Sequence, residues 1–129
     1  MASSKFEFEP ARADGAFKAK RSTETVLEAE LLLDGAPYNL TGFTGVRVNV
    51  AREDPPYSGT LVNEISAHAG SITNAPLGLV SATLSAVQMN IPEGDHLVMF
   101  DIMNGATVAD RVPRGMSYLR LIVGKAIGT

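Results

Sequence analysis

The stretch GVRVNVA, from Gly45 to Ala51, places a valine at every second position between polar or small residues. Strict alternation of this kind is typical of a β-strand with one face buried and the other face in contact with solvent. Other segments of the chain show the same period of two, and clusters of Gly, Pro, Asn and Asp separate them. This pattern predicts an all-β domain, either an antiparallel β-sandwich or a barrel.

The same criteria predict strands along the whole chain, at 24–33, 45–51, 61–65, 71–73, 79–84, 96–103, 107–112 and 116–127. Residues 24–33 also contain helix-forming Glu, Ala and Leu, but helical spacing would place Glu28 beside Leu31, so we predict a strand. All seven prolines fall outside the cores of these segments, which agrees with the rarity of proline inside sheets. The alternation places Val48, Phe100 and Leu121 in the core.

The connections carry their own signals. Asn104-Gly105 lies between two predicted strands and predicts a type I′ hairpin with positive φ at both residues. Ser85-Ala-Val-Gln88 matches a capping box, in which the Ser85 hydroxyl and the Gln88 side chain each bond to the other residue's backbone N–H. Only one helical turn fits before Pro92. His68-Ala-Gly70 is expected to be a loop between two short strands, the second of which, 71–73, pairs with 79–84.

Composition limits the classes of function. A chain of 129 residues supports one domain, and the absence of cysteine excludes disulfides and thiol catalysis. A net charge of −3 provides no field that attracts nucleic acid or an anionic membrane. We find no signal-peptide pattern and no apolar run of membrane-spanning length, so we expect synthesis in a cytoplasm, with no nucleic-acid or membrane partner.

The first residues differ from the rest of the chain. Phe6, Phe8 and Phe17 are three of only five phenylalanines, and Ser, Pro, Asp and Gly interrupt any period between them. We interpret residues 1–21 as an N-terminal arm that docks on another subunit through these three aromatic rings, and residues 22–129 as the β domain. The alternative is an edge strand from Lys5 to Glu9, where Phe alternates with charged residues, that folds back on its own domain, because termini are ordered only when they are held down.

Candidate groups for catalysis or metal binding are few and scattered. They are His68, His96, Asp95, Glu93, Asp101 and Asp110. Asp95 and His96 are neighbours in a predicted strand, so they point to opposite faces and cannot hold one ion together. No nucleophile-elbow or phosphate-loop motif is present. We therefore expect no enzyme activity, no catalytic residue, no cofactor and no metal.

Tyrosine is the remaining candidate for ligand recognition. A sugar-binding sandwich presents exposed aromatic side chains, and with no tryptophan in the chain only Tyr38, Tyr57 and Tyr118 could serve. Tyrosines at such positions more often close the end of a sandwich, with the ring buried and the hydroxyl in contact with water.

One segment resembles a known family. Leu33-Asp-Gly-Ala-Pro-Tyr-Asn-Leu-Thr-Gly42 is similar to the D-G-x-P-x-D-L-T-G turn that opens the N-terminal domain of tailed-phage baseplate upper proteins and related immunoglobulin-like phage tail modules. The later segments keep the expected order, with a turn at 85–89, a strand led by Gly94, a hairpin, and a last strand after Gly115. The resemblance extends from about Glu24 to Lys125.

The resemblance implies an immunoglobulin-like antiparallel β-sandwich and a non-enzymatic structural role in a bacteriophage particle. It implies a protein made in the cytoplasm of a host bacterium that mediates subunit assembly in the virion, at a baseplate, neck, fibre-attachment or capsid-decoration position. Its expected partners are other copies of itself, in a homo-oligomer, and other virion proteins. The alternative function is a receptor- or glycan-binding adhesin module.

Overall fold

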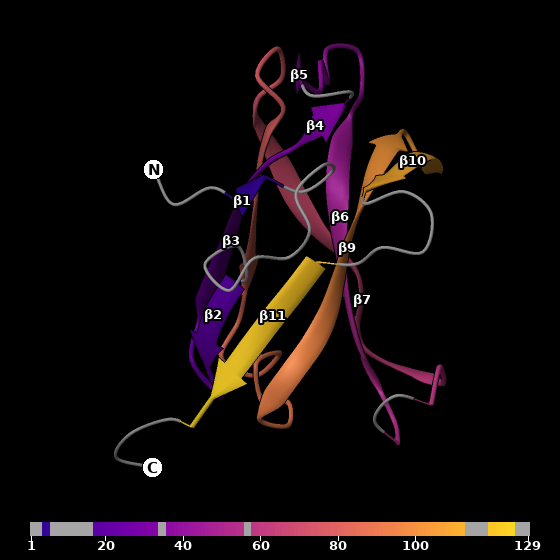
Figure 1. The fold of residues 1–129 in the computed structure, drawn as a ribbon. Helices are drawn as coiled ribbons and strands as arrows, with labels where there is room; N and C mark the ends of the chain where they lie inside the picture. Colours follow the sequence, from indigo (N-terminus) through magenta and orange to yellow (C-terminus); the bar gives the residue numbers. More distant parts are fainter. Residues whose placement is uncertain (1–3, 6–16, 34–35, 56–57, 113–118, 126–129) are drawn as a thin grey trace.

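The computed structural model describes residues 4–5, 17–33, 36–55, 58–112 and 119–125. Within these residues 67% of the chain is strand and none is helix (Figure 1), so no helix there is long and apolar enough to cross a membrane. The strands are β1 (Ser4–Lys5), β2 (Phe17–Lys20), β3 (Thr25–Glu30), β4 (Leu32–Leu33), β5 (Ala36–Pro37), β6 (Gly45–Glu53), β7 (Leu61–Asn74), β8 (Leu79–Leu84), β9 (Gly94–Asn104), β10 (Thr107–Val112) and β11 (Leu119–Gly124).

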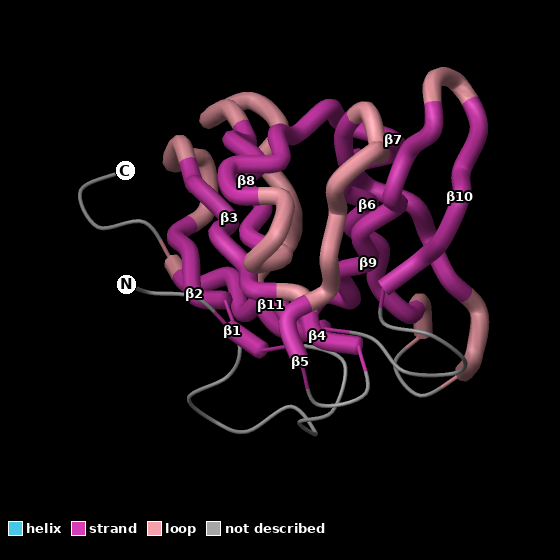
Figure 2. The backbone as a smooth tube through the Cα atoms, turned by 90° about the horizontal axis from the view of Figure 1, so that it is seen from above, coloured by secondary structure: helices cyan, strands magenta, loops and turns pink. Residues whose placement is uncertain are grey.

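One large sheet contains nine of these strands. Its order is β1-β3-β8-β7-β6-β9-β11-β2, with β10 paired to β9 outside this path, while β4 and β5 form a separate hairpin. The sheet is mixed and curls into a nearly closed, barrel-like form. Figure 2 shows its strands arranged around a common interior, with β8 and β3 on one side and β6 and β9 on the other.

The prediction of an all-β fold is confirmed, but a purely antiparallel sheet is wrong. β11 pairs in parallel with β2, with Leu121 opposite Phe17, and β1 pairs in parallel with β3. An immunoglobulin-like sandwich is not confirmed either, because the sheet runs without a break from one half of the molecule to the other. The barrel, the other alternative from the sequence, describes the arrangement better.

β7 makes this continuity possible. Its first part pairs with β6, with His68 opposite Val48, and its last part pairs with β8, with Ser71 opposite Ser81. The register shifts between Val48 and Val50, where Asn49 Oδ1 accepts the Ala67 N–H at 2.8 Å. Such a bulge bends a strand and increases its twist, so one strand can serve both halves.

The prediction of a loop at His68-Ala-Gly70 is therefore wrong. Gly70 lies within β7, at a point where the backbone of β8 comes very close to it. A Cβ at Gly70 would lie 2.7 Å from the backbone oxygen of Ser81. The predicted pairing of 71–73 with 79–84 is confirmed by the opposed pairs Ser71–Ser81 and Ile72–Val80.

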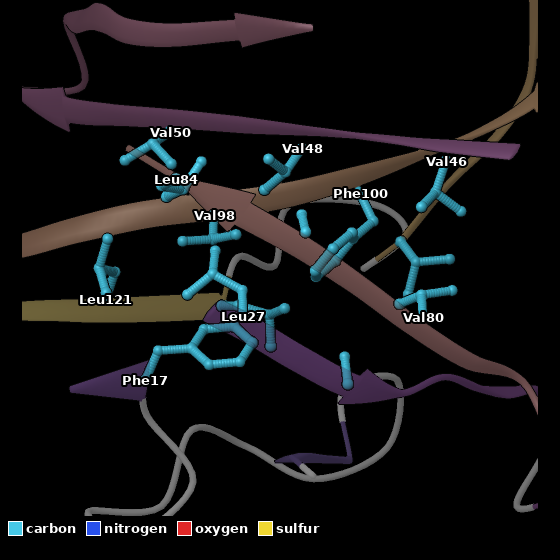
Figure 3. Packing of buried hydrophobic residues seen from close by; sticks show 14 of the residues in the cluster. Phe17, Leu27, Val46, Val48, Val50, Val80, Leu84, Val98, Phe100 and Leu121 are labelled. Atoms are coloured by element: carbon cyan, nitrogen blue, oxygen red, sulfur yellow. The ribbon is translucent and has the colours of Figure 1, made fainter. Parts of the chain in front are cut away.

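The core consists of the inward-facing positions that the alternation predicted (Figure 3). Val48, Phe100 and Leu121 are each 0% exposed, which confirms their assignment to the core. The fully buried strand residues on the same faces include Val50, Val98, Ile102 and Leu84. The predicted strands 79–84 and 107–112 coincide with β8 and β10, and the strand interpretation of 24–33 is confirmed by β3.

The β9–β10 hairpin differs from the predicted type I′ turn by one position. Asn104 ends β9 and lies opposite Thr107, so the two loop residues are Gly105 and Ala106. Gly105 has a φ of +62°, and Asn104 is not among the residues with positive φ. Positive φ at the first loop residue alone is the requirement of a type II′ turn, which takes glycine there.

Candidate functional site

Polar side chains gather around the connection between β8 and β9, residues 85–93, which we call the crossover. Its first turn is the predicted capping box, and the structure confirms it. The Gln88 N–H donates to Ser85 Oγ at 3.1 Å, and the Ser85 N–H donates to Gln88 Oε1 at 2.9 Å. The Met89 N–H donates to the Ser85 carbonyl at 2.9 Å, which completes one helical turn.

His68 contacts this turn from β7. Its Nδ1 lies 3.0 Å from the amide nitrogen Nε2 of Gln88, and its Nε2 lies 2.7 Å from the carbonyl oxygen of Thr83. The sequence placed His68 in a loop with unknown neighbours. Its contacts arise because β7 and β8 are adjacent in the sheet, so that the ring reaches the residues that follow β8.

His96 holds the other end of the crossover. Its ring is 1% exposed and lies on the inner face of β9, the face that also carries the buried side chains of Val98 and Phe100. Nε2 lies 2.7 Å from the carbonyl oxygen of Pro92, and Nδ1 makes a very short contact with the Glu64 carboxylate. The side chain of Glu64, on β7, is itself only 7% exposed.

Arg52 of β6 extends this group. Its Nε lies 3.2 Å from Glu64 Oε2, yet this buried nitrogen has no hydrogen-bond partner. Arg52 Nε and Glu64 Oε2 are close enough to form an ion pair, but the Nε–H does not point at the oxygen as a hydrogen bond requires. The attraction between the two groups is therefore mainly Coulombic. Nη1 of the same guanidinium lies 3.3 Å from Asp54 Oδ2.

A shallow pocket of about 540 Å³ opens beside His96. It lies between the end of β6, the start of β9 and β11, and its charged lining residues are Arg52, Glu53, Asp54, Glu93, Asp95 and Arg120. Arg120 Nη2 donates to Asp95 Oδ2 at 2.9 Å. Because the Asp95 side chain is 60% exposed, this pair contributes little to stability.

Asp101 and Asp110 lie elsewhere. Asp101, on the outer face of β9, accepts hydrogen bonds from Asn49 Nδ2 at 3.0 Å and Arg111 Nε at 3.1 Å. Asp110 Oδ2, on β10, accepts a hydrogen bond from the Tyr38 hydroxyl, with 2.7 Å between the two oxygens. Both carboxylates therefore connect strands to each other or to a loop.

The six candidate groups from the sequence are thus not brought together at one point. His96, Asp95 and Glu93 border the pocket, whereas His68, Asp101 and Asp110 lie in separate contacts. Among the described residues no group of three or more His, Cys, Asp or Glu side chains is arranged to hold a metal. Glu64 and Arg52 could not be identified from the sequence, because nothing in the local pattern indicates that either residue belongs to a contact with a histidine on another strand.

Tyr38 is 8% exposed and closes one end of the core. Its ring meets Phe43 edge-on, with 6.4 Å between the ring centroids and 72° between the planes, and its hydroxyl contacts Asp110. This arrangement agrees with the structural interpretation of the tyrosines rather than with an exposed sugar platform. Tyr57 and Tyr118 lie outside the described residues.

The three phenylalanines of the predicted arm separate into two groups. Phe17 lies in β2 and is 9% exposed, and Figure 3 shows its ring directed toward the cluster that contains Leu27 and Leu121. Phe17 therefore belongs to the fold of its own domain, because the pairing of β2 with β11 carries the ring into the core. Beyond Lys5, the alternative edge strand at 5–9 lies outside the described residues. Phe6 and Phe8 lie outside the described residues, so their role in assembly stays a prediction.

Comparison with known proteins identifies a similar fold. No protein-family model matches the chain, and no curated protein matches it. Among solved structures, the chain is similar to the N-terminal domain of phage TP901-1 ORF48, with a TM-score of 0.62 and 13% sequence identity, over 97% of this chain and 100% of that domain. At such an identity the likeness is one of fold.

A second solved structure is the endo-beta-1,4-mannanase from Thermotoga petrophila. It aligns with 88% of this chain at 10% identity and a TM-score of 0.41, and the chain spans only 19% of that enzyme.

Proposed function

We propose that this chain is a non-enzymatic structural protein of a phage particle that assembles with other virion proteins. The observation that carries the proposal is the likeness to the N-terminal domain of phage TP901-1 ORF48, which covers 97% of this chain and all of that domain. The likeness agrees with the independent resemblance of residues 33–42 to the turn that opens the N-terminal domain of baseplate upper proteins.

The hydrogen bonds of His68 and His96 support a non-enzymatic role. A general base needs a ring nitrogen or carboxylate oxygen within reach of a substrate proton. Both ring nitrogens of His96 are occupied by Glu64 and Pro92, and both ring nitrogens of His68 are occupied by Gln88 and Thr83. These groups hold the fold together.

Within the particle, we propose that the chain joins subunits, and that it contacts further copies of itself as well as other virion proteins. Residues 1–21 are the proposed source of the assembly contact, now through Phe6 and Phe8 because Phe17 faces the core. The baseplate, the neck, a fibre-attachment point and the capsid surface are the candidate positions.

The test is the composition of purified particles from the strain that encodes the chain. Quantitative mass spectrometry should find its peptides in a fixed ratio to the major virion proteins after density-gradient purification. Chemical cross-linking of the same particles should join it to baseplate, neck, fibre or capsid proteins, and the identity of that partner gives its position. Recovery of the chain only from the soluble lysate, with none in particles, would overturn the proposal.

A further inference from the structure

The two histidines of this chain both contact the crossover, one at each end, through different hydrogen-bond partners. We propose that residues 85–93 form a pH-sensitive latch, which His68 holds as a neutral imidazole and which His96 holds through a proton shared with Glu64. This inference concerns a conformational device and does not depend on the proposed role in a virion.

The capping box determines the state of His68. Gln88 Oε1 accepts the Ser85 N–H, so the end of the Gln88 side chain that faces His68 Nδ1 is its NH₂ group, which only donates. Nδ1 must therefore accept, and the ring proton must lie on Nε2, which donates to the Thr83 carbonyl. A second proton on Nδ1 would place two donors against each other and break the contact with Gln88.

The partners of His96 require the opposite state. The Pro92 carbonyl can only accept, so Nε2 carries a proton. The Glu64 carboxylate faces Nδ1, and two unprotonated groups in contact in a buried site would leave two unsatisfied acceptors. One further proton between Nδ1 and Oε1 satisfies both. Loss of that proton would set a lone pair against a buried carboxylate and loosen the contact.

The charged groups around His96 come from every element that surrounds it. Glu64 of β7 contacts the ring directly. The pocket beside the ring is also lined by Arg52 and Glu53 of β6, Asp54 just after β6, Glu93 just before β9, Asp95 of β9 and Arg120 of β11. The neighbours of His68 are Val48 across the sheet, Thr83 and Gln88, and none of them carries a charge.

The crossover is hydrogen-bonded to the turn between β2 and β3. The Met89 carbonyl accepts the Ser22 N–H at 2.8 Å, and Asn90 Oδ1 accepts from Arg21 Nε at 3.2 Å and from Ser22 Oγ at 3.3 Å. Arg21 and Ser22 link β2 to β3. The sheet order ends at β2 on one side and at β1, which pairs with β3, on the other, so this turn lies at the seam where the sheet does not close. Opening of the latch would therefore release the turn that holds this seam.

The pH dependence follows from the two states. The His68 contact stabilises the latch where the ring is neutral and is lost as the pH falls, whereas the His96 contact is lost as the pH rises. We therefore expect the latch to be closed near neutral pH, to open in acid through loss of the His68 contact, and to open in alkali through loss of the His96 contact.

The direct test is the protonation of the ring nitrogens in the full chain, measured by long-range ¹H–¹⁵N NMR near pH 7. We expect His68 to show one protonated nitrogen, Nε2, and His96 to show two protonated nitrogens or a proton shared with Glu64. A proton on Nδ1 of His68, or a bare ring nitrogen on His96 in contact with unprotonated Glu64, would overturn the proposal.

Amide hydrogen exchange measures whether the crossover opens when the pH changes. After correction for intrinsic rates, protection of the Gln88 and Met89 amides should fall about threefold to tenfold relative to Val48 in mild acid and again in mild alkali, the change expected when one hydrogen bond is lost. Protection that does not change with pH would contradict the latch.

Two nearly isosteric variants separate the two ends. In Gln88→Glu the carboxylate can accept from Ser85 and from a protonated His68, so the loss of protection in acid should disappear while the loss in alkali stays. In Glu64→Gln the amide NH₂ can donate to a neutral His96, so the loss in alkali should disappear while the loss in acid stays. If either variant keeps both losses, its histidine does not hold the latch.

Discussion

At the scale of single residues, the tightest constraint lies at Gly78. Its φ is +68°, and a Cβ there would lie 2.6 Å from the Leu31 carbonyl oxygen and 2.8 Å from that of Tyr38. The Leu31 N–H donates to the Gly78 carbonyl at 2.8 Å, so neither backbone can move away without the loss of a hydrogen bond. A side chain at this position would destabilise the fold for two reasons, the unfavourable positive φ and the steric overlap of its Cβ with the two carbonyl oxygens.

Gly78→Ala tests this account, and Gly105→Ala is its matched control. Gly105 has nearly the same φ, +62°, but no atom lies within 4 Å of its built Cβ. We expect Gly105→Ala to lower the free energy of unfolding by about 1–2 kcal/mol, the cost of a left-handed conformation. Gly78→Ala should cost about 1–3 kcal/mol more because of steric overlap. If urea unfolding gave the same loss of unfolding free energy for both variants, the Leu31 backbone would have to shift to make room for the added methyl group.

Phe100 provides a second prediction at this scale. It is 0% exposed in the centre of the core, and Phe100→Ala should reduce the free energy of unfolding by about 3–5 kcal/mol through lost burial and a cavity. Val87→Ala is the control, because Val87 is 85% exposed, and it should change stability by no more than about 0.5 kcal/mol. Similar thermal unfolding midpoints for both variants would contradict the inward register of β9.

At the scale of elements, β2 changes what the N-terminal segment contributes. Its four residues pair with β11, and Phe17 enters the core from it. A chain that begins at Ser22 would leave this edge of β11 unpaired and remove one large buried side chain. If residues 1–21 were only an arm and residues 22–129 the whole β domain, such a chain would remain folded. The position of Phe17 in the core leads us to expect the opposite.

We expect the chain that begins at Ser22 to be at least about 3 kcal/mol less stable than the full chain, the lower range for loss of a buried phenylalanine. A chain that begins at Ala16 keeps β2 and is the control, and it should be much closer to the full chain. Chemical denaturation of the three proteins decides the point. Equal stability of all three would mean that β2 adds nothing to the fold.

At the scale of the whole molecule, assembly and folding should depend on different phenylalanines. The double variant Phe6→Ser, Phe8→Ser should enter purified particles less well than the unchanged chain, while its thermal unfolding midpoint stays the same. Docking of a large apolar side chain on a neighbour contributes roughly 1.5–3 kcal/mol, so loss of two such side chains should be visible in quantitative mass spectrometry.

Phe17→Ala is the contrasting variant. It should lower the unfolding midpoint, because Phe17 belongs to the core cluster. Normal incorporation of the Phe6 and Phe8 double variant would remove the reason for assigning assembly to this segment, whatever the behaviour of Phe17→Ala.

The sequence alone determined the local features of this protein. The period of two identified the strands and the buried face of each, as at Val48 and Phe100, because successive side chains of a strand point to opposite faces whatever the neighbouring strands are. The capping box of Ser85 and Gln88 was equally local, since its two hydrogen bonds join residues three positions apart. The Asn104-Gly105 signal correctly placed a hairpin but missed its loop by one residue, because strand pairing continued through Asn104.

The closure of these strands into one sheet depends on contacts between distant parts of the chain. The parallel pairing of Phe17 with Leu121, the shared use of β7 by both halves, and the contact of His96 with Glu64 each join distant parts of the chain. A strand edge offers the same N–H and C=O groups to any partner, so its own sequence does not specify which edge it meets. The partner is selected by the combined packing of the core. This packing gives a nearly closed barrel where a sandwich was predicted, and it brings both histidines into contact with the crossover.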